Sequence, residues 1–123
     1  MEIDEIRQYC LYKPGTTEDF PFDQQTLVFK VMGKMYALIG LEKWEAGNPA
    51  INLKCDPEKA IELRERYPDE IYGGYHMSKK HWNTVVINGP HLTQKKILHF
   101  INHSYELVVS QLTKKQKEEL SKL

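Results

Sequence analysis

The sequence predicts one α+β domain in which an antiparallel or mixed sheet carries its helices on one side. The length of 123 residues is close to the commonest size of a single domain. Hydrophobic residues make up 41% and charged residues 28% of the chain, which is ordinary for a globular protein. The apolar pattern changes in the order helix, three strands, helix, strand, helix, and this order favours α+β packing. We therefore expect residues 1–123 to form one domain.

The N-terminal segment predicts a short helix followed by a loop. Ile3, Ile6 and Cys10 recur at helical spacing, and Pro14 ends the pattern. Residues 17–23 place two phenylalanines around a proline, a combination that suits an irregular segment whose rings are pinned to the core. We expect an ordered loop there.

Three strands are predicted next. Residues 26–31 and 35–41 are rich in β-branched and aromatic side chains, and the three residues between them favour a tight hairpin. A turn-rich patch at residues 45–49 follows. Residues 51–55 then alternate apolar and polar, which predicts a third strand with one buried face.

The signals for a second helix begin at Asp56, which can cap it, and Pro57, which suits the first helical position. We expect this helix to end near Tyr67, because Pro68 disfavours helical backbone before it. The residues that recur at helical spacing within it are Ala60, Ile61, Leu63 and Arg64.

The second half of the chain predicts a strand and a long helix. Gly73-Gly74 indicates a flexible or tightly bent passage, and residues 82–87 are strongly strand-like up to the turn signal at residues 88–90. A long helix is expected from about Thr93, and the tail of residues 113–123 is a polar helix or a frayed end. The apolar face of the long helix carries Ile97, Ile101, Tyr105, Val108 and Leu112.

Charge is balanced overall and uneven locally. The chain has 17 basic and 17 acidic residues, and a net charge of zero counts against a dedicated nucleic-acid binder. Residues 71–105, however, contain no aspartate or glutamate and hold all five histidines. The lysines of this acid-free region are Lys79, Lys80, Lys95 and Lys96. The neutral total therefore hides a polarised chain.

Nothing in the sequence indicates secretion or membrane insertion. The N-terminus is acidic and polar, and no run approaches about 18 apolar residues. Cys10 and Cys55 are far apart and form no metal-binding or redox spacing, so we expect reduced thiols in a cytoplasmic protein.

Several blocks of sequence, in order between about residues 20 and 88, resemble the signature blocks of the MmcQ/YjbR-like family of bacterial proteins. This resemblance implies a CyaY/frataxin-like α+β fold, with an antiparallel sheet and helices packed on one side. It also implies a DNA-binding role through a double-wing arrangement of β-hairpins. The blocks are Phe20-Pro21-Phe22-Asp23, Thr26-Leu27-Val28-Phe29-Lys30-Val31, Gly33-Lys34-Met35, Asn52-Leu53-Lys54-Cys55-Asp56-Pro57-Glu58 and Tyr75-His76-Met77-Ser78-Lys79-Lys80-His81-Trp82-Asn83-Thr84-Val85.

The segment Lys79-Lys80-His81-Trp82-Asn83 is the best candidate for a binding function. Its ammonium groups can contact phosphates, its indole can stack on a base, and its amide can read a base edge. The alternative is structural: Trp82 anchors the core, and the lysines only solvate a loop. The full candidate set for DNA binding is Lys54, Tyr75, His76, Lys79, Lys80, His81, Trp82 and Asn83.

The remaining reactive side chains predict neither an enzyme nor a metal or cofactor site. His99, His103 and Glu106 share one helical face, but exposed polar faces often produce such trios by chance. Cys55 precedes a helix cap without a nearby base, so we expect it to be buried as a small apolar side chain. The first helix has too few carboxylates for the acidic iron-binding ridge of frataxin-like proteins.

The sequence thus favours a small DNA-binding protein that contacts phosphates through its acid-free region. The competing hypothesis is a protein-interaction module whose exposed aromatic residues, such as Trp44 or Trp82, engage a partner chain. Salt distinguishes the two, because phosphate contacts weaken steeply as salt rises.

Overall fold

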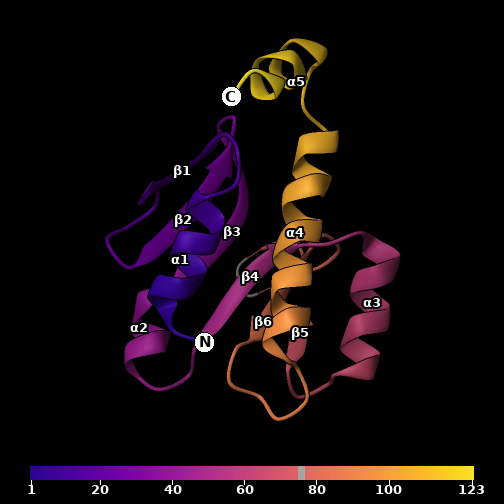
Figure 1. Cartoon of the computed structure of the whole chain (residues 1–123). Coiled ribbons are helices and arrows are strands. Elements are labelled where there is room, and N and C mark those ends of the chain that lie inside the picture. Colours follow the sequence, from indigo (N-terminus) through magenta and orange to yellow (C-terminus); the bar gives the residue numbers. More distant parts are fainter. Residues whose placement is uncertain (75–76) are drawn as a thin grey trace.

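The computed structural model describes residues 1–74 and 77–123 (Figure 1). Within them, six strands form one sheet in the order β1-β2-β3-β4-β6-β5. Every neighbouring pair is antiparallel. The strands are β1 (Thr16–Asp19), β2 (Thr26–Val31), β3 (Lys34–Gly40), β4 (Ala50–Lys54), β5 (Ile71–Gly73) and β6 (Trp82–Val86).

Five helices accompany the sheet in the same described residues. They are α1 (Ile3–Leu11), α2 (Leu41–Glu45), α3 (Pro57–Arg66), α4 (Gln94–Ser110) and α5 (Lys114–Ser121). The long helix α4 contacts β2, β3 and β4, whereas α1 contacts β1 and α3 contacts β5 (Figure 1). None of the described helices has both the length and the apolar character needed to cross a lipid bilayer.

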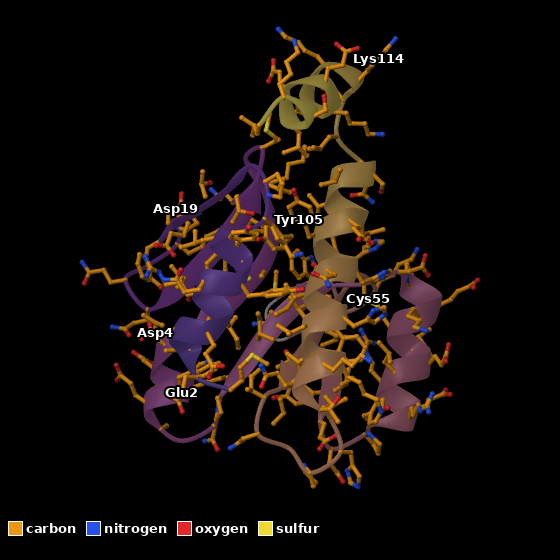
Figure 2. All side chains as sticks on the ribbon, viewed as in Figure 1. Glu2, Asp4, Asp19, Cys55, Tyr105 and Lys114 are labelled. Carbon is orange, nitrogen blue, oxygen red and sulfur yellow. The ribbon has the colours of Figure 1, made fainter. Side chains whose placement is uncertain are left out.

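The main core lies between the sheet and the helices, and all five helices contribute to it. Phe29, Tyr36 and Ile101 are completely buried there. Tyr105 of α4, which is labelled in Figure 2, meets the Tyr36 ring edge-on, with the ring centroids 5.3 Å apart. The other face of the sheet carries a smaller cluster, to which none of the described helices contributes. We call this second face the open face; its cluster consists of Val28, Leu38, Trp82, Met35 and Met77.

Ser104 of α4 joins two strands at the place where they separate. The pairing of β3 with β4 covers only Ala37↔Leu53 and Leu38↔Asn52. The hydroxyl of Ser104 donates to the carbonyl oxygen of Tyr36 at 2.5 Å and accepts from the backbone N–H of Lys54 at 2.9 Å. The helix therefore satisfies two backbone groups that lie just beyond the paired residues.

Most of the predicted elements are confirmed. The hairpin is β2 and β3, and Met32 and Gly33 at its turn both have positive φ, of 50° and 82°, which suits the twist of the flanking strands. The third predicted strand is β4, and the strand expected at residues 82–87 is β6. Asp56 caps α3 by accepting from the N–H of Glu58 at 3.1 Å. The long helix is α4, and the polar tail forms α5.

The prediction of a loop at residues 17–23 was wrong in two respects. Its first part belongs to β1, which pairs with β2 through backbone groups from Thr16↔Val31 to Asp19↔Val28. The side chains of Phe20 and Phe22 are 46% and 64% exposed, so the two rings are not pinned to the core. The strand was missed because its sequence, TTED, has no apolar residue to indicate a buried face.

The predicted order of elements also lacked β5 and the short helix α2. These elements have three and five residues, which is too short for a periodic pattern to emerge. On α3, Ala60 and Leu63 are buried as expected, but Ile61 is exposed. At about 100° per residue, Ile61 falls well away from the face that Ala60 and Leu63 share.

Candidate nucleic-acid interface

The candidate lysines lie on a tight turn that leads into β6. The carbonyl oxygen of Ser78 accepts from the N–H groups of His81, at 3.1 Å, and Trp82, at 2.9 Å. The side chains of Lys79 and Lys80 are exposed on this turn, and His81 is partly buried. We call residues 78–82 the basic turn.

The basic turn is attached to the sheet on both sides. The N–H of Cys55, directly after β4, donates to the carbonyl oxygen of His81 at 2.7 Å. The N–H of Gly74, directly after β5, donates to the carbonyl oxygen of Trp82 at 3.0 Å. The backbone beneath the lysines is therefore held by two neighbouring strands.

Arg64 of α3 adds a third attachment. Its Nε donates to Oδ1 of Asn83 at 2.7 Å, and its Nη2 donates to the carbonyl oxygens of Trp82, at 3.2 Å, and Lys79. The sequence pattern had placed Arg64 among the recurring residues of this helix, next to Leu63. An arginine beside a buried leucine can bring its five donors to acceptors of a neighbouring segment, and this was the available signal for the role of Arg64.

Gly73 explains how the side chain of Lys79 lies. A Cβ built on Gly73 would be 3.0 Å from Cγ of Lys79, so the aliphatic part of the lysine packs across the glycine backbone at the end of β5. Within the described residues, neither Lys79 nor Lys80 forms an ion pair. Their ammonium groups are available to an external anion.

Two members of the predicted site are not placed to contact a base. Trp82 is only 8% exposed and packs with Val28 and Leu38 on the open face. Asn83 is 2% exposed, and its Oδ1 accepts from Arg64. Contacts of Trp82 and Asn83 with bases stay predictions, and the structure shows both side chains buried. The alternative, that Trp82 anchors the interior, describes its position.

The other members of the candidate set have different surroundings. Lys54 lies opposite Trp82 in the register of β4 and β6, so these strands do bring the two positions together. Its ammonium group donates to Oε1 of Gln111 at 3.1 Å. Tyr75 and His76 lie outside the described residues.

The trio on α4 is not arranged as a metal site. Nε2 of His103 accepts from the N–H of Asp56 at 3.4 Å. Across residues 1–74 and 77–123, no group of three potential ligands comes close enough to hold a metal ion.

The two thiols are buried, as expected for Cys55. Burial raises the pKa of Cys55 to about 11, and the neighbouring Asp56 adds to this effect. Burial raises the pKa of Cys10 to about 12. Both side chains are therefore protonated thiols near neutral pH, which makes them poor nucleophiles.

The chain matches a known protein family over most of its length. A family model described as YjbR matches residues 11–107 of the chain. The chain belongs to the YjbR family. This YjbR-family chain is 32% identical over 123 residues to the uncharacterized protein YjbR of Escherichia coli strain K12, and the match covers 100% of both chains. It is 38% identical over 112 residues to the uncharacterized protein YbdF of Escherichia coli O157:H7, covering 91% of this chain and 88% of that one.

Solved structures share the fold of this YjbR-family chain. A Deinococcus radiodurans protein with the domain DUF419 superposes with a TM-score of 0.86 at 39% identity, covering 97% of this chain and 87% of that one. A Pseudomonas syringae crystal structure gives a TM-score of 0.72 at 33% identity, covering 87% and 98%. The family resemblance predicted from the blocks between residues 20 and 88 is confirmed and extends over most of the chain.

Proposed function

We propose that the chain binds nucleic acid through phosphate contacts made by Lys79 and Lys80. The observation that carries this proposal is the pair of adjacent, exposed ammonium groups on a turn held by β4, β5 and Arg64. Since the backbone is already fixed, binding a phosphate costs little more than ordering the two side chains.

The same geometry argues for binding with little sequence preference. Phosphate contacts position a protein on nucleic acid, whereas contacts to base edges read the sequence. Trp82 and Asn83, the two residues expected to contact bases, are buried. With a net charge of zero for the whole chain, the affinity should also be modest.

Three further expectations remain part of this proposal. We assign the fold to the CyaY/frataxin-like class, because an antiparallel sheet with its helices packed on one core-forming face is what that resemblance implies. We assign a cytoplasmic location, which the two protonated, unbridged cysteines support. We assign a binding role without catalysis, since the thiols lack the lowered pKa of a nucleophile.

The test is a fluorescence anisotropy titration of a short labelled duplex at about 50 mM and about 200 mM salt. The variant is Lys79→Ala/Lys80→Ala. The matched control is Lys114→Ala/Lys115→Ala, which removes two consecutive exposed lysines from the start of α5. Figure 2 shows Lys114 far along the molecule from Cys55, the residue that is hydrogen-bonded to the basic turn.

We expect the control to bind like the wild type and the Lys79/Lys80 variant to bind weakly. The slope of log affinity against log salt should fall by about 1.8, at about 0.9 for each phosphate that the variant no longer neutralises. If both double variants bind equally weakly, the basic turn is not the site. If the wild type does not bind at about 50 mM salt, nucleic-acid binding is wrong and the protein-interaction hypothesis takes its place.

That second hypothesis now rests on different residues. Trp44 is partly buried, and its Nε1 donates to the carbonyl oxygen of Ala50 at 2.9 Å, while Trp82 is buried. The exposed phenylalanine rings of the described residues are those of Phe20 and Phe22, which follow the edge strand β1. Binding of a partner there would be abolished by Phe22→Ala and would be nearly insensitive to salt.

A further inference from the structure

The open face holds a pocket with a volume of about 490 Å³. Its floor is a row of side chains across three strands, since Asn52 of β4 pairs with Leu38 of β3 on one side and with Thr84 of β6 on the other. Antiparallel partners directly opposite one another share a face of the sheet. The row therefore forms one continuous surface at the bottom of the pocket.

The walls of the pocket are apolar and adaptable. Met35, Met77 and Trp82 line it beside Leu38, and Phe22 stands at its rim. Methionine side chains adjust to irregular shapes, and small-molecule sites of about 300–1,000 Å³ are typically apolar with a few polar groups. The pocket thus has the size and lining of a site for a small organic ligand.

The side-chain acceptors of Asp23 and Asn52 in the pocket are already engaged. The carboxylate of Asp23 accepts from the N–H groups of Gln25, at 2.8 Å, and Thr26, at 2.7 Å, and from the Thr26 hydroxyl at 3.3 Å. These hydrogen bonds hold the pKa of Asp23 below its usual range. The Thr84 hydroxyl donates to Oδ1 of Asn52 at 2.5 Å.

Two donors of the pocket, in contrast, remain available. Lys43 of α2 lines the pocket, is exposed, and forms no ion pair with any residue in the described part of the chain. The Nδ2 group of Asn52 has no hydrogen bond within the same residues, because the bond to Thr84 uses the amide oxygen. A ligand that complements apolar walls and these two free donors is an apolar molecule with an anionic acceptor.

We propose that this pocket binds a small organic monocarboxylate. The carboxylate lies against Lys43 and the Asn52 amide, and the hydrocarbon body covers Leu38, Met35 and Trp82. The pocket shares Trp82 with the basic turn, but its proposed ligand contacts do not involve Lys79 or Lys80, on which nucleic-acid binding rests.

Gly40 allows the pocket to be filled without disturbing the fold. It lines the pocket, and a Cβ built on it would meet no atom within 4 Å. Its φ of −83° and ψ of 107° suit any L residue. Gly40→Leu should therefore place a side chain in the space that the ligand would occupy.

The test is a titration with sodium octanoate followed by ¹H–¹⁵N NMR, with octan-1-ol as the uncharged comparison. The chain has two tryptophans, so two indole N–H signals are expected, and Trp44→Phe assigns them. We expect octanoate to move the Trp82 signal in a saturable way and to bind more tightly than octan-1-ol. Lys43→Ala should weaken octanoate about two- to five-fold, the range of an exposed ion pair, whereas Lys59→Ala on α3 should have no effect.

Gly40→Leu should abolish the shift while the rest of the spectrum remains that of the folded protein. The proposal is overturned if Gly40→Leu binds octanoate like the wild type, or if octan-1-ol binds as tightly as octanoate. It is also overturned if the Trp82 signal moves with protein concentration instead of with octanoate, since a second copy of the chain would then occupy the open face.

Discussion

Nε of Arg64 and Oδ1 of Asn83 are joined by a hydrogen bond of 2.7 Å that links α3 to β6 beneath the basic turn. The Nδ2 group of the same amide is buried without a hydrogen-bond partner in the described residues. Asn83 therefore depends on Arg64 for its side-chain hydrogen bonding, and the position of the turn depends on the same guanidinium.

Arg64→Met should destabilise the fold and weaken nucleic-acid binding together. The substitution keeps the aliphatic stem but leaves Oδ1 of Asn83 buried without a donor, which costs about 1–3 kcal/mol. Urea unfolding measures the loss of stability, and the anisotropy titration measures the affinity. Arg66→Met, which removes an equal charge from an exposed position on the same helix, should change both far less. Equal effects of the two variants would mean that charge, and not the position of the turn, is responsible.

Ser104→Ala should lower the free energy of unfolding by about 1–3 kcal/mol. The substitution leaves the carbonyl oxygen of Tyr36 without its donor and the N–H of Lys54 without its acceptor. Ser110→Ala is the matched control on the same helix, where the hydroxyl is exposed and bonds only to the carbonyl of Leu107. The control should stay within about 0.5 kcal/mol of the wild type. A neutral Ser104→Ala would show that β3 and β4 do not need the bridge.

Gly89→Ala should be strongly unfavourable. A Cβ at this position would be 2.3 Å from Oε1 of Glu70, and that carboxylate is 2% exposed and accepts from the N–H of His91 at 2.7 Å. Overpacking of this kind costs about 1–3 kcal/mol. Gly40→Ala, where the added Cβ meets open space, should be neutral or stabilising by up to about 1 kcal/mol. Thermal unfolding of both variants checks this contrast, and a similar melting temperature for the two would contradict it.

The buried thiols should make stability fall at alkaline pH. For Cys55 the folded pKa is about 11 against 9.0 for an ordinary thiol, so the folded state binds more protons between these values. Its contribution is complete below about pH 9 and is lost as the pH rises toward 11. Cys55→Ala should flatten the stability curve in that range.

The burial of both thiols also predicts that they react slowly with disulfide reagents at pH 8. A disulfide reagent such as dithionitrobenzoate should label the folded chain slowly and label both cysteines at once in urea. Rapid labelling of the folded chain would contradict the buried positions of the thiols.

The sequence predicted the elements that have a strong pattern of their own. The hairpin of β2 and β3 has β-branched runs and a turn glycine, and α4 has an apolar stripe from Ile97 to Val108. β1 was not predictable from its own residues, because its pairing with β2 is made by backbone groups. For β6, Trp82 and Thr84 face the open side while Asn83 faces α3, and all three are buried. Since residues of β6 are buried on both faces of the sheet, no alternation of apolar and polar residues could show which side each residue takes.

For the candidate interface, the sequence left open whether Trp82 contacts a base or anchors the core, and it did not indicate that Asn83 is buried. A tryptophan and an asparagine beside lysines resemble a nucleic-acid contact when only composition is visible. The burial of Trp82 depends on Val28 and Leu38 of two other strands, and Asn83 is met by Arg64 of α3, which lies 19 positions away in the chain. Contacts of that separation are decided by packing and leave no local pattern.

The two outermost strands of the sheet, β1 and β5, have only four and three residues. A long outer strand offers a row of unpaired N–H and C=O groups to which another chain can add, and this is a common route to aggregation. Here each border of the sheet ends after a few residues, so a foreign strand would find little to pair with. Because these edge strands are short, they are hard to predict from the sequence. The same shortness protects the protein against edge-to-edge pairing of sheets between molecules.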